Sequence, residues 1–287
     1  RGYHPFILFF YYICVGSLAM FFNHPLFLTI GLCLLIFVNV THDRGQTLRK
    51  WSPMLLLMSS FIIILNPFFV SRGSTILFYF RGKQVTLEAT VYGVVFSLSI
   101  AIILVMFISF NLILNGNKFL FLFSKVFPKT TFLTMLAIRF APLLKMRLEE
   151  INAVQQTRGM RMDVGTIRER ARSGLLRLQI LITWSLEEAI QTSDSMKARG
   201  YGIGNRSAYV PYKMEKRDWV SFVMLAVLFI FCLIGGALGY GKILIYPELG
   251  TLHMYSLDWI VLVCMMIIYA FPLLAEGRER ARWTFSQ

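Results

Sequence analysis

Long apolar runs constrain this chain more than any other feature of its sequence. Six runs are as long as a membrane span or nearly so: residues 6–22, 25–40, 51–70, 88–114, 219–239 and 257–275. A helix of about 20 apolar residues crosses the hydrocarbon layer of a bilayer, and a helix satisfies its own backbone hydrogen bonds there. Only 15% of the residues are charged, against about a quarter in soluble domains. We therefore expect an all-α membrane protein with about six transmembrane helices.

Positive charge is concentrated between the fourth and fifth apolar runs. Residues 115–217 contain 18 of the 29 Lys and Arg residues and 8 of the 15 Asp and Glu residues, which is +10 of the net charge of +14. The positive-inside rule places such a block in the cytoplasm. We therefore expect N-terminal transmembrane helices in residues 1–114 and a cytoplasmic or interfacial module in residues 115–217. A C-terminal pair of transmembrane helices with a basic tail follows in residues 218–287.

The shorter loops agree with one orientation of this chain in a membrane. The loop at residues 41–50 is basic, and the tail carries Arg278, Arg280 and Arg282, which favours the cytoplasm for both. With six spans, the N-terminus and the C-terminus are then both cytoplasmic. Residues 71–87 lie outside in this topology, and the pattern at 76–85 predicts a small hairpin around a turn.

The basic module is expected to consist of long amphipathic helices. Pro128 favours a helix start at residues 129–131, and the apolar residues that follow recur at helical spacing. A second helical stretch begins near residues 163–166, with a possible break at Ser173 and Gly174. From Leu175 onward this stretch is apolar on one face, and Arg177 with the following Glu187 and Glu188 favours an interfacial or interhelical position.

Both of these helical stretches end in an Arg-Gly pair, at Arg158-Gly159 and at Arg199-Gly200. Glycine readily adopts the left-handed conformation that ends a helix. The arginine before it then projects from a blunt tip, and its guanidinium can hold a carboxylate through two hydrogen bonds. Two such tips in one basic module suit docking onto partner proteins. Ordinary helix ends with solvated arginines remain the alternative.

Four stretches together resemble a known family. They read PKTT at 128–131, LAIRFAPLL at 136–144, QQTRG at 155–159 and SMKARGY at 195–201. The chain is similar here to the transmembrane T component of energy-coupling-factor (ECF) transporters, which are importers of vitamins and metal ions related to ABC transporters. The resemblance is strongest over about 128–202, and the pattern of spans extends it along nearly the whole chain. The second triplet matches the family's usual Ala-Arg-Gly, whereas the first has Thr157 in place of alanine.

The resemblance implies a role in a complex at the bacterial plasma membrane. Two cytoplasmic ABC ATPase subunits would bind the tips, and one small membrane substrate-binding (S) subunit would lie against the apolar helix faces. The ATPase-docking residues are then Arg158, Gly159, Ala198, Arg199 and Gly200. The residues expected to face the S subunit are Leu133, Leu136, Phe140, Leu175, Leu178 and Ile182. This chain would itself be non-catalytic.

Other functions have weaker support in the sequence. A phosphate loop of the form GxxxxGK[ST] does not occur, and the four cysteines lie in apolar runs without a CxxC pair. We therefore expect no cofactor, no metal site and no nucleic acid partner. The alternative is a membrane enzyme or scaffold that binds anionic lipid or acidic protein surfaces through its arginine-rich module. An enzyme of that kind usually needs clustered carboxylates, and the module has no such cluster.

Overall fold

The structure, a computed structural model, describes residues 3–70, 73–80, 83–124, 126–158, 166–204, 212–245, 250 and 254–285. For residues 275–285 it describes the backbone. The chain divides into two compact units. The first unit comprises residues 1–118 and 212–287, and the second comprises residues 119–211. Each unit is described by itself below.

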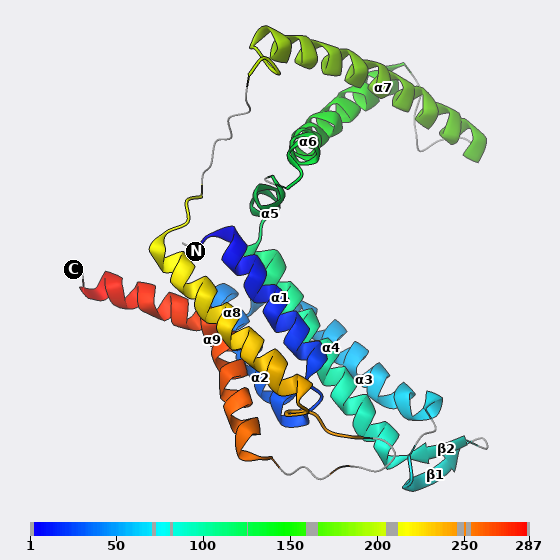
Figure 1. The fold of residues 1–287 in the computed structure, drawn as a ribbon. Helices are drawn as coiled ribbons and strands as arrows, with labels where there is room; N and C mark the ends of the chain where they lie inside the picture. The colour runs from blue at the N-terminus through cyan, green and yellow to red at the C-terminus, as the bar shows by residue number, and fades with distance from the viewer. Residues whose placement is uncertain are drawn as a thin grey trace. The chain divides into compact units, whose positions relative to one another are not determined.

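The first unit is a bundle of long apolar helices (Figure 1). Its helices are α1 (Pro5–Phe21), α2 (Pro25–Asp43), α3 (Gln46–Phe69), α4 (Leu87–Ile113), α8 (Lys216–Ala237) and α9 (Ser256–Phe285). Among the described residues, five of them are long and apolar enough to cross a membrane, and α1 is a shorter apolar helix of 17 residues. The chain is thus an all-α membrane protein, and each of the six predicted apolar runs forms a helix.

Two histidines fix the starts of the first two helices. Pro5 and Pro25 occupy the first turns of α1 and α2, where proline removes no helical hydrogen bond. The Nδ1 atoms of His4 and His24 accept hydrogen bonds from the backbone N–H groups of the second helical residues, both at 3.2 Å. These imidazoles therefore act as N-caps, a role more often taken by Ser, Thr, Asp or Asn.

A short hairpin precedes α4, as the sequence predicts. Strands β1 (Ile76–Phe80) and β2 (Lys83–Thr86) pair antiparallel, with a register irregularity between Ile76 and Phe78. The chain entering the hairpin is held by Glu88 in the first turn of α4. One carboxylate oxygen of Glu88 accepts hydrogen bonds from the backbone N–H and hydroxyl groups of both Ser74 and Thr75, at 2.7–3.2 Å. This carboxylate therefore ties the segment before β1 to the start of a long helix.

The core of the first unit is built around α1, the shortest of its helices. One side of α1 is fully buried, and Tyr11 on that side bonds to α9. The Tyr11 hydroxyl donates to the Tyr269 carbonyl at 3.1 Å, and the Tyr269 hydroxyl donates to the Val15 carbonyl at 3.3 Å. This reciprocal pair fastens the first helix of the unit to its last helix, which is more than 250 residues away in the chain.

Three further polar side chains inside the bundle also have partners. The Tyr12 and Ser109 hydroxyls lie 2.9 Å apart, which links α1 to α4. The Asn39 amide on α2 donates to the Leu35 carbonyl at 3.0 Å and to the Val105 carbonyl of α4 at 3.3 Å. Hydrogen bonds of this kind hold helices together in a solvent that offers no alternative partner.

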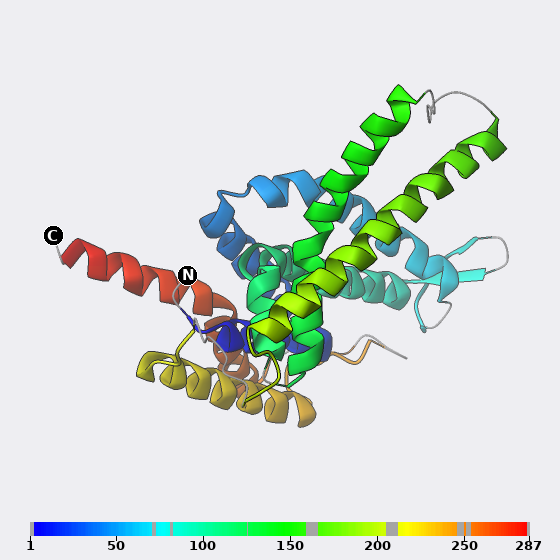
Figure 2. The same ribbon diagram turned by 90° about the horizontal axis from the view of Figure 1, so that it is seen from above.

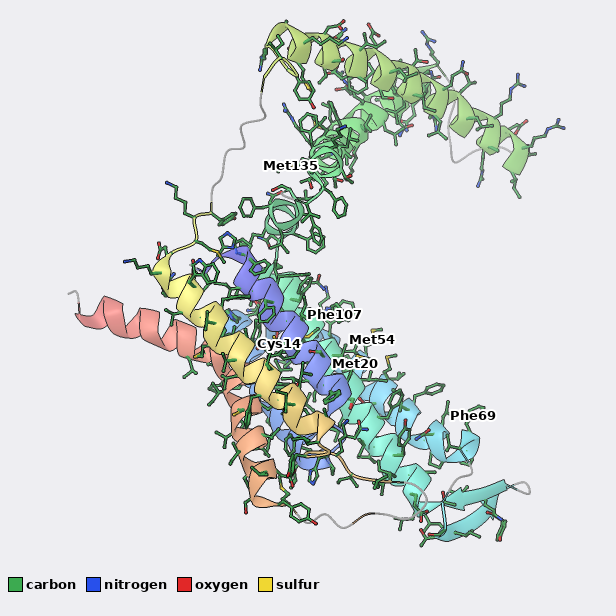
Figure 3. All side chains as sticks on the ribbon, in the orientation of Figure 1. Cys14, Met20, Met54, Phe69, Phe107 and Met135 are labelled. Carbon is green, nitrogen blue, oxygen red and sulfur yellow. The ribbon has the colours of Figure 1, made fainter. Side chains whose placement is uncertain are left out.

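Glycines allow α8 to approach its neighbours closely. A Cβ atom added at Gly235 would lie 2.8 Å from Val261 of α9, and one added at Gly236 would overlap the ring of Phe21 at the end of α1. Small residues commonly permit such backbone approach between membrane helices. Helix α3, by contrast, is mostly exposed, and Met54 and Phe69 point away from the bundle (Figure 3).

The second unit contains α6 (Pro128–Thr157), α7 (Ile167–Ala198) and most of α5 (Gly116–Phe123). Helix α6 begins at Pro128, in agreement with the prediction. Helix α7 begins with a capping box, in which Thr166 and Glu169 each bond to the other's backbone N–H. The predicted break at Ser173 and Gly174 is wrong, because α7 continues through both residues. One unfavourable glycine costs only about 1 kcal/mol in a helix interior, which a helix of 32 residues tolerates.

The two helical glycines Gly236 and Gly174 provide a matched test of this packing. We expect Gly236→Ala to destabilise the protein by about 1–3 kcal/mol, because the added methyl group overpacks the contact with Phe21. Gly174→Ala should leave stability unchanged or raise it by up to about 1 kcal/mol, since no atom lies within 4 Å of the added Cβ. The measurement is thermal unfolding of the detergent-solubilised protein. Equal melting temperatures for the two variants would contradict the close packing of α8.

The buried cap at His24 predicts a dependence of stability on pH. Burial lowers the pKa of the His24 imidazole below its ordinary value of 6.5, although the nearby Asp258 carboxylate opposes the shift. A lowered folded-state pKa stabilises the protein above the unfolded pKa, and this contribution is lost as the pH falls from about 6.5 through the folded value. Thermal unfolding at a series of pH values should show that His24→Asn, which keeps a capping side chain, weakens the loss at acidic pH. His4→Asn, at the less buried cap, is the control and should retain it.

Candidate protein-docking site

Helices α6 and α7 form an antiparallel pair that crosses, as Figure 2 shows. Two aromatic contacts fix the direction of the pair. Phe132 near the start of α6 stacks on Tyr201 just beyond the end of α7, with ring centroids 5.6 Å apart. Further along, the Arg147 guanidinium of α6 lies 4.8 Å from the ring centroid of Trp184 on α7. The C-terminal ends of the two helices therefore lie at opposite ends of the pair.

The end of α7 has the geometry that the sequence predicts. Gly200 has a φ angle of +83°, in the left-handed region that glycine occupies without strain. The Gly200 N–H donates to the Lys197 carbonyl at 2.9 Å, and the Tyr201 N–H donates to the Met196 carbonyl at 3.0 Å. These two bonds make a Schellman motif, so the last carbonyls of α7 are satisfied by the chain itself.

This ending leaves the side chain of Arg199 at the tip of α7. Arg199 is the C-cap residue, with φ −81° and ψ 5°, and its side chain is exposed, as is that of Ala198. Because the carbonyls are already bonded to backbone N–H groups, they do not require the guanidinium. The Arg199 side chain is therefore available to bind a group outside the chain.

The end of α6 carries a second exposed arginine. Arg158 is the C-cap of α6, with φ −82° and ψ 7°. The hydroxyl of Thr157, which departs from the family triplet, donates to the Val154 carbonyl of its own helix at 2.7 Å. The hydroxyl is thus turned back onto the helix, and Thr157 differs little from alanine as a surface for a partner. Gly159 lies outside the described residues.

Arg158 and Arg199 form no ion pair with the described part of the chain. The ion pairs found on α6 and α7 among described residues are Arg147 with Glu150 at 2.6 Å and Lys197 with Asp194 at 3.8 Å. Neither pair involves Arg158 or Arg199. An exposed arginine that is unpaired in the chain can form a bidentate contact with a partner carboxylate at little cost in lost contacts.

The six residues predicted to face an S subunit divide into two groups. Leu133, Leu175, Leu178 and Ile182 are each at least half exposed. Leu136 and Phe140 are partly buried, so they offer less surface to a partner. The three α7 residues are spaced three and four residues apart, which places them along one face of that helix. This exposed apolar face needs lipid or another protein to cover it.

Three further residues of α6 and α7 are buried or contact the other helix, and the sequence analysis did not predict most of this. Arg177 of α7 is only 2% exposed, and Gln155 near the end of α6 is also buried. Trp184 is turned toward α6, where it contacts Arg147. The signal in the sequence was Arg177, inside the apolar stretch that begins at Leu175, which favoured an interfacial or interhelical position.

The site offers binding chemistry rather than ligands for a metal. Among the described residues, no group of three or more His, Cys, Asp or Glu side chains could hold a metal ion. What the second unit presents is two cationic helix ends and exposed apolar faces. This combination is suited to recognising acidic and apolar surfaces of other proteins.

Comparisons with known proteins identify relatives of this chain. The family model described as CbiQ, cobalt transport protein, matches residues 5–210. An energy-coupling factor transporter transmembrane protein EcfT from Staphylococcus aureus is 31% identical over 91 residues, which is 31% of this chain and 34% of that protein. EcfT from Macrococcus caseolyticus is 25% identical over 189 residues, 61% of this chain and 68% of that protein. The chain thus spans about a third of the first relative and about two thirds of the second.

The family match includes the four membrane helices before the module and both arginine tips. It also covers well over half of the chain, and the two relatives are proteins of one kind. The chain therefore belongs to the CbiQ family of cobalt transport proteins and is an EcfT-like T component of energy-coupling-factor transporters.

Proposed function

We propose that this chain couples ATP hydrolysis by two cytoplasmic ABC ATPases to the movement of a separate membrane subunit that binds the substrate. The observation that carries this proposal is the pair of exposed arginines at opposite ends of two crossed helices. One ATPase would bind the tip at Arg158 and the other the tip at Arg199. The imported substrate would be a vitamin or a metal ion, and the name of the family favours cobalt.

The mechanism follows from the stiffness of the two helices. Each contains 30 or more residues, about 45 Å of helix or more at 1.5 Å per residue. When the ATPases close around ATP, the distance between the bound tips changes, and the crossed helices pivot about their aromatic contacts. The exposed face with Leu175, Leu178 and Ile182 moves with α7 and tilts the substrate-binding subunit. This chain hydrolyses nothing in this scheme.

The orientation proposed for the membrane follows from the distribution of charge. The basic module and both termini would lie in the cytoplasm, because that leaflet is anionic and because basic loops are retained on that side. The β1–β2 hairpin and the loop between α8 and α9 would lie outside.

Charge reversal at the tips should prevent docking. We expect Arg158→Glu and Arg199→Glu each to weaken capture of the ATPases by at least about 30-fold, as loss of a central interface arginine does, and to abolish uptake. Arg199→Lys should have an intermediate effect, because lysine keeps the charge but cannot form a bidentate contact. The measurements are copurification of ATPases with tagged protein in detergent and uptake of radiolabelled substrate in proteoliposomes.

Two variants serve as controls for this experiment. Thr157→Ala should leave capture unchanged, since the hydroxyl that it removes bonds to Val154 in its own helix. Arg172→Glu reverses an exposed charge on α7 about 40 Å along the helix from Arg199 and should also bind ATPases normally. Normal transport in the Arg158→Glu, Arg199→Glu double variant would exclude docking through the tips.

Single-cysteine labelling tests the orientation in the membrane. A membrane-impermeant maleimide applied to intact cells should label a cysteine at position 250 and should not label cysteines at positions 45 or 203. Permeabilised cells should give labelling at all three positions, which controls for accessibility. Labelling of position 203 in intact cells would place the coupling module outside and would contradict the proposed docking of cytoplasmic ATPases.

A further inference from the structure

A second exposed surface lies just before α6 and is not used by the docking tips. Helix α5 contains five consecutive apolar residues, Phe119 to Phe123, and none of the residues of the helix is buried. Two more apolar side chains follow it, Val126 and Phe127, which are 66% and 58% exposed. Three of these seven apolar residues are exposed and four are partly buried, so the segment presents apolar surface that needs a covering.

The connection to α4 limits where this segment can lie. Helix α4 has 27 residues and is therefore about 40 Å long, enough to cross about 30 Å of hydrocarbon completely. Only Leu114 and Asn115 separate its end from α5. The Lys118 Nζ donates to the Ile113 carbonyl at 3.0 Å, which ties the first turn of α5 to the end of the span. Helix α5 therefore begins at the boundary of the membrane.

The length of α5 excludes a second crossing. Its eight residues extend about 12 Å, less than half of the hydrocarbon thickness. A short apolar helix at the boundary lies in the interface, with its apolar side chains at the edge of the acyl chains. Helices that lie in the interface carry Trp, Phe or Leu on their apolar face, and the five apolar residues of α5 are all Phe or Leu.

The positive charge of the chain around α5 indicates which class of lipid it binds. Between Glu88 and Glu149 the sequence contains no Asp or Glu. It contains six basic residues there: Lys118, Lys125, Lys129, Arg139, Lys145 and Arg147. Lys129 is exposed in the first turn of α6. Basic residues near a membrane surface attract anionic headgroups, and no carboxylate in this stretch offsets that attraction.

We propose that residues 116–124 and 126–129 form a binding surface for anionic phospholipid at the membrane face where α4 emerges. The phenylalanines enter the boundary of the acyl chains, while Lys118 and Lys129 contact headgroup phosphates. Bound lipid holds the start of α6 at the membrane, so that the helix has a fixed end against which its other end moves. The inference depends on α4 being a membrane span and is independent of ATPase docking.

Photo-crosslinking tests what covers this surface. Benzoylphenylalanine replaces Phe119 or Phe127 in the full transporter complex, held in nanodiscs of phosphatidylglycerol and phosphatidylcholine in equal amounts. After irradiation, intact mass spectrometry identifies the adducts. We expect lipid adducts at both positions, with phosphatidylglycerol in excess. The same reagent at Phe61, which is exposed on the span α3, is the control and should capture both lipids equally.

Removing the lysines tests the role of charge. Each lysine near an anionic surface contributes about fivefold to lipid preference, so Lys129→Gln should lower the excess of phosphatidylglycerol at Phe127 by up to about fivefold. Adding Lys118→Gln should lower it further, and the ratio at Phe61 should not change. Because Lys118 also bonds to Ile113, the single Lys129→Gln variant gives the same test without altering the end of α4.

Two results would overturn the proposal. Adducts to another protein at Phe119 and Phe127 would mean that a subunit, rather than lipid, covers the segment. A phosphatidylglycerol ratio at Phe127 equal to that at Phe61, and unchanged in Lys129→Gln, would mean that the covering lipid is not selected by charge. ATPase capture measured on the same variants separates this result from the docking proposal, since loss of lipid preference with normal capture affects only this surface.

Discussion

Hydrocarbon offers no hydrogen-bond partner, and the first unit of this protein is built around that constraint. The reciprocal bonds between Tyr11 and α9 and between Tyr269 and α1 satisfy two buried hydroxyls and join the two ends of the bundle. Asn39 serves in the same way between α2 and α4. Where no polar side chain intervenes, Gly235 and Gly236 bring α8 close to its neighbours. A bundle fixed in this way can serve as a stable anchor while attached parts move.

The second unit is built differently from the first, because most of its surface is left exposed for binding other molecules. Its two long helices contact each other through a few large side chains, Phe132 with Tyr201 and Arg147 with Trp184. Such sparse contacts hold a crossing without burying the remaining faces. The Schellman motif at Gly200 then stops α7 abruptly and leaves Arg199 beyond the last turn. A stiff rod with a blunt cationic end is suited to transmitting a displacement from one bound protein to another.

The two proposed surfaces lie toward opposite ends of α6, so that one end moves with a bound protein while lipid holds the other. The end of α6 that carries Arg158 is the one expected to follow an ATPase. Its other end begins at Pro128, next to the basic, apolar segment that we assign to the lipid interface. A helix held at one end converts a shift of the other end into a rotation. An unanchored helix would merely translate with its partner.

Local chemistry in the sequence predicted much of this fold. The apolar runs identified the spans, the pattern at residues 76–85 identified the hairpin, and Pro128 marked the start of α6. Gly200 adopts the left-handed conformation that was expected of it. These features depend on a few neighbouring residues, so they can be read without knowledge of the fold. The break expected at Ser173 and Gly174 failed because a weak local signal was outweighed by the long helix around it.

The sequence by itself determined which segments leave water, where the basic charge lies and where two helices end in exposed arginines. It could not determine the direction in which α6 and α7 cross, which depends on contacts between residues some 40 to 70 positions apart. Only the tertiary structure put Arg158 and Arg199 at opposite ends of the pair. It also decided that Arg177 is buried while Leu175 is exposed. The physical reason is that periodicity fixes the angle between side chains on one helix, whereas burial depends on which face a second helix covers.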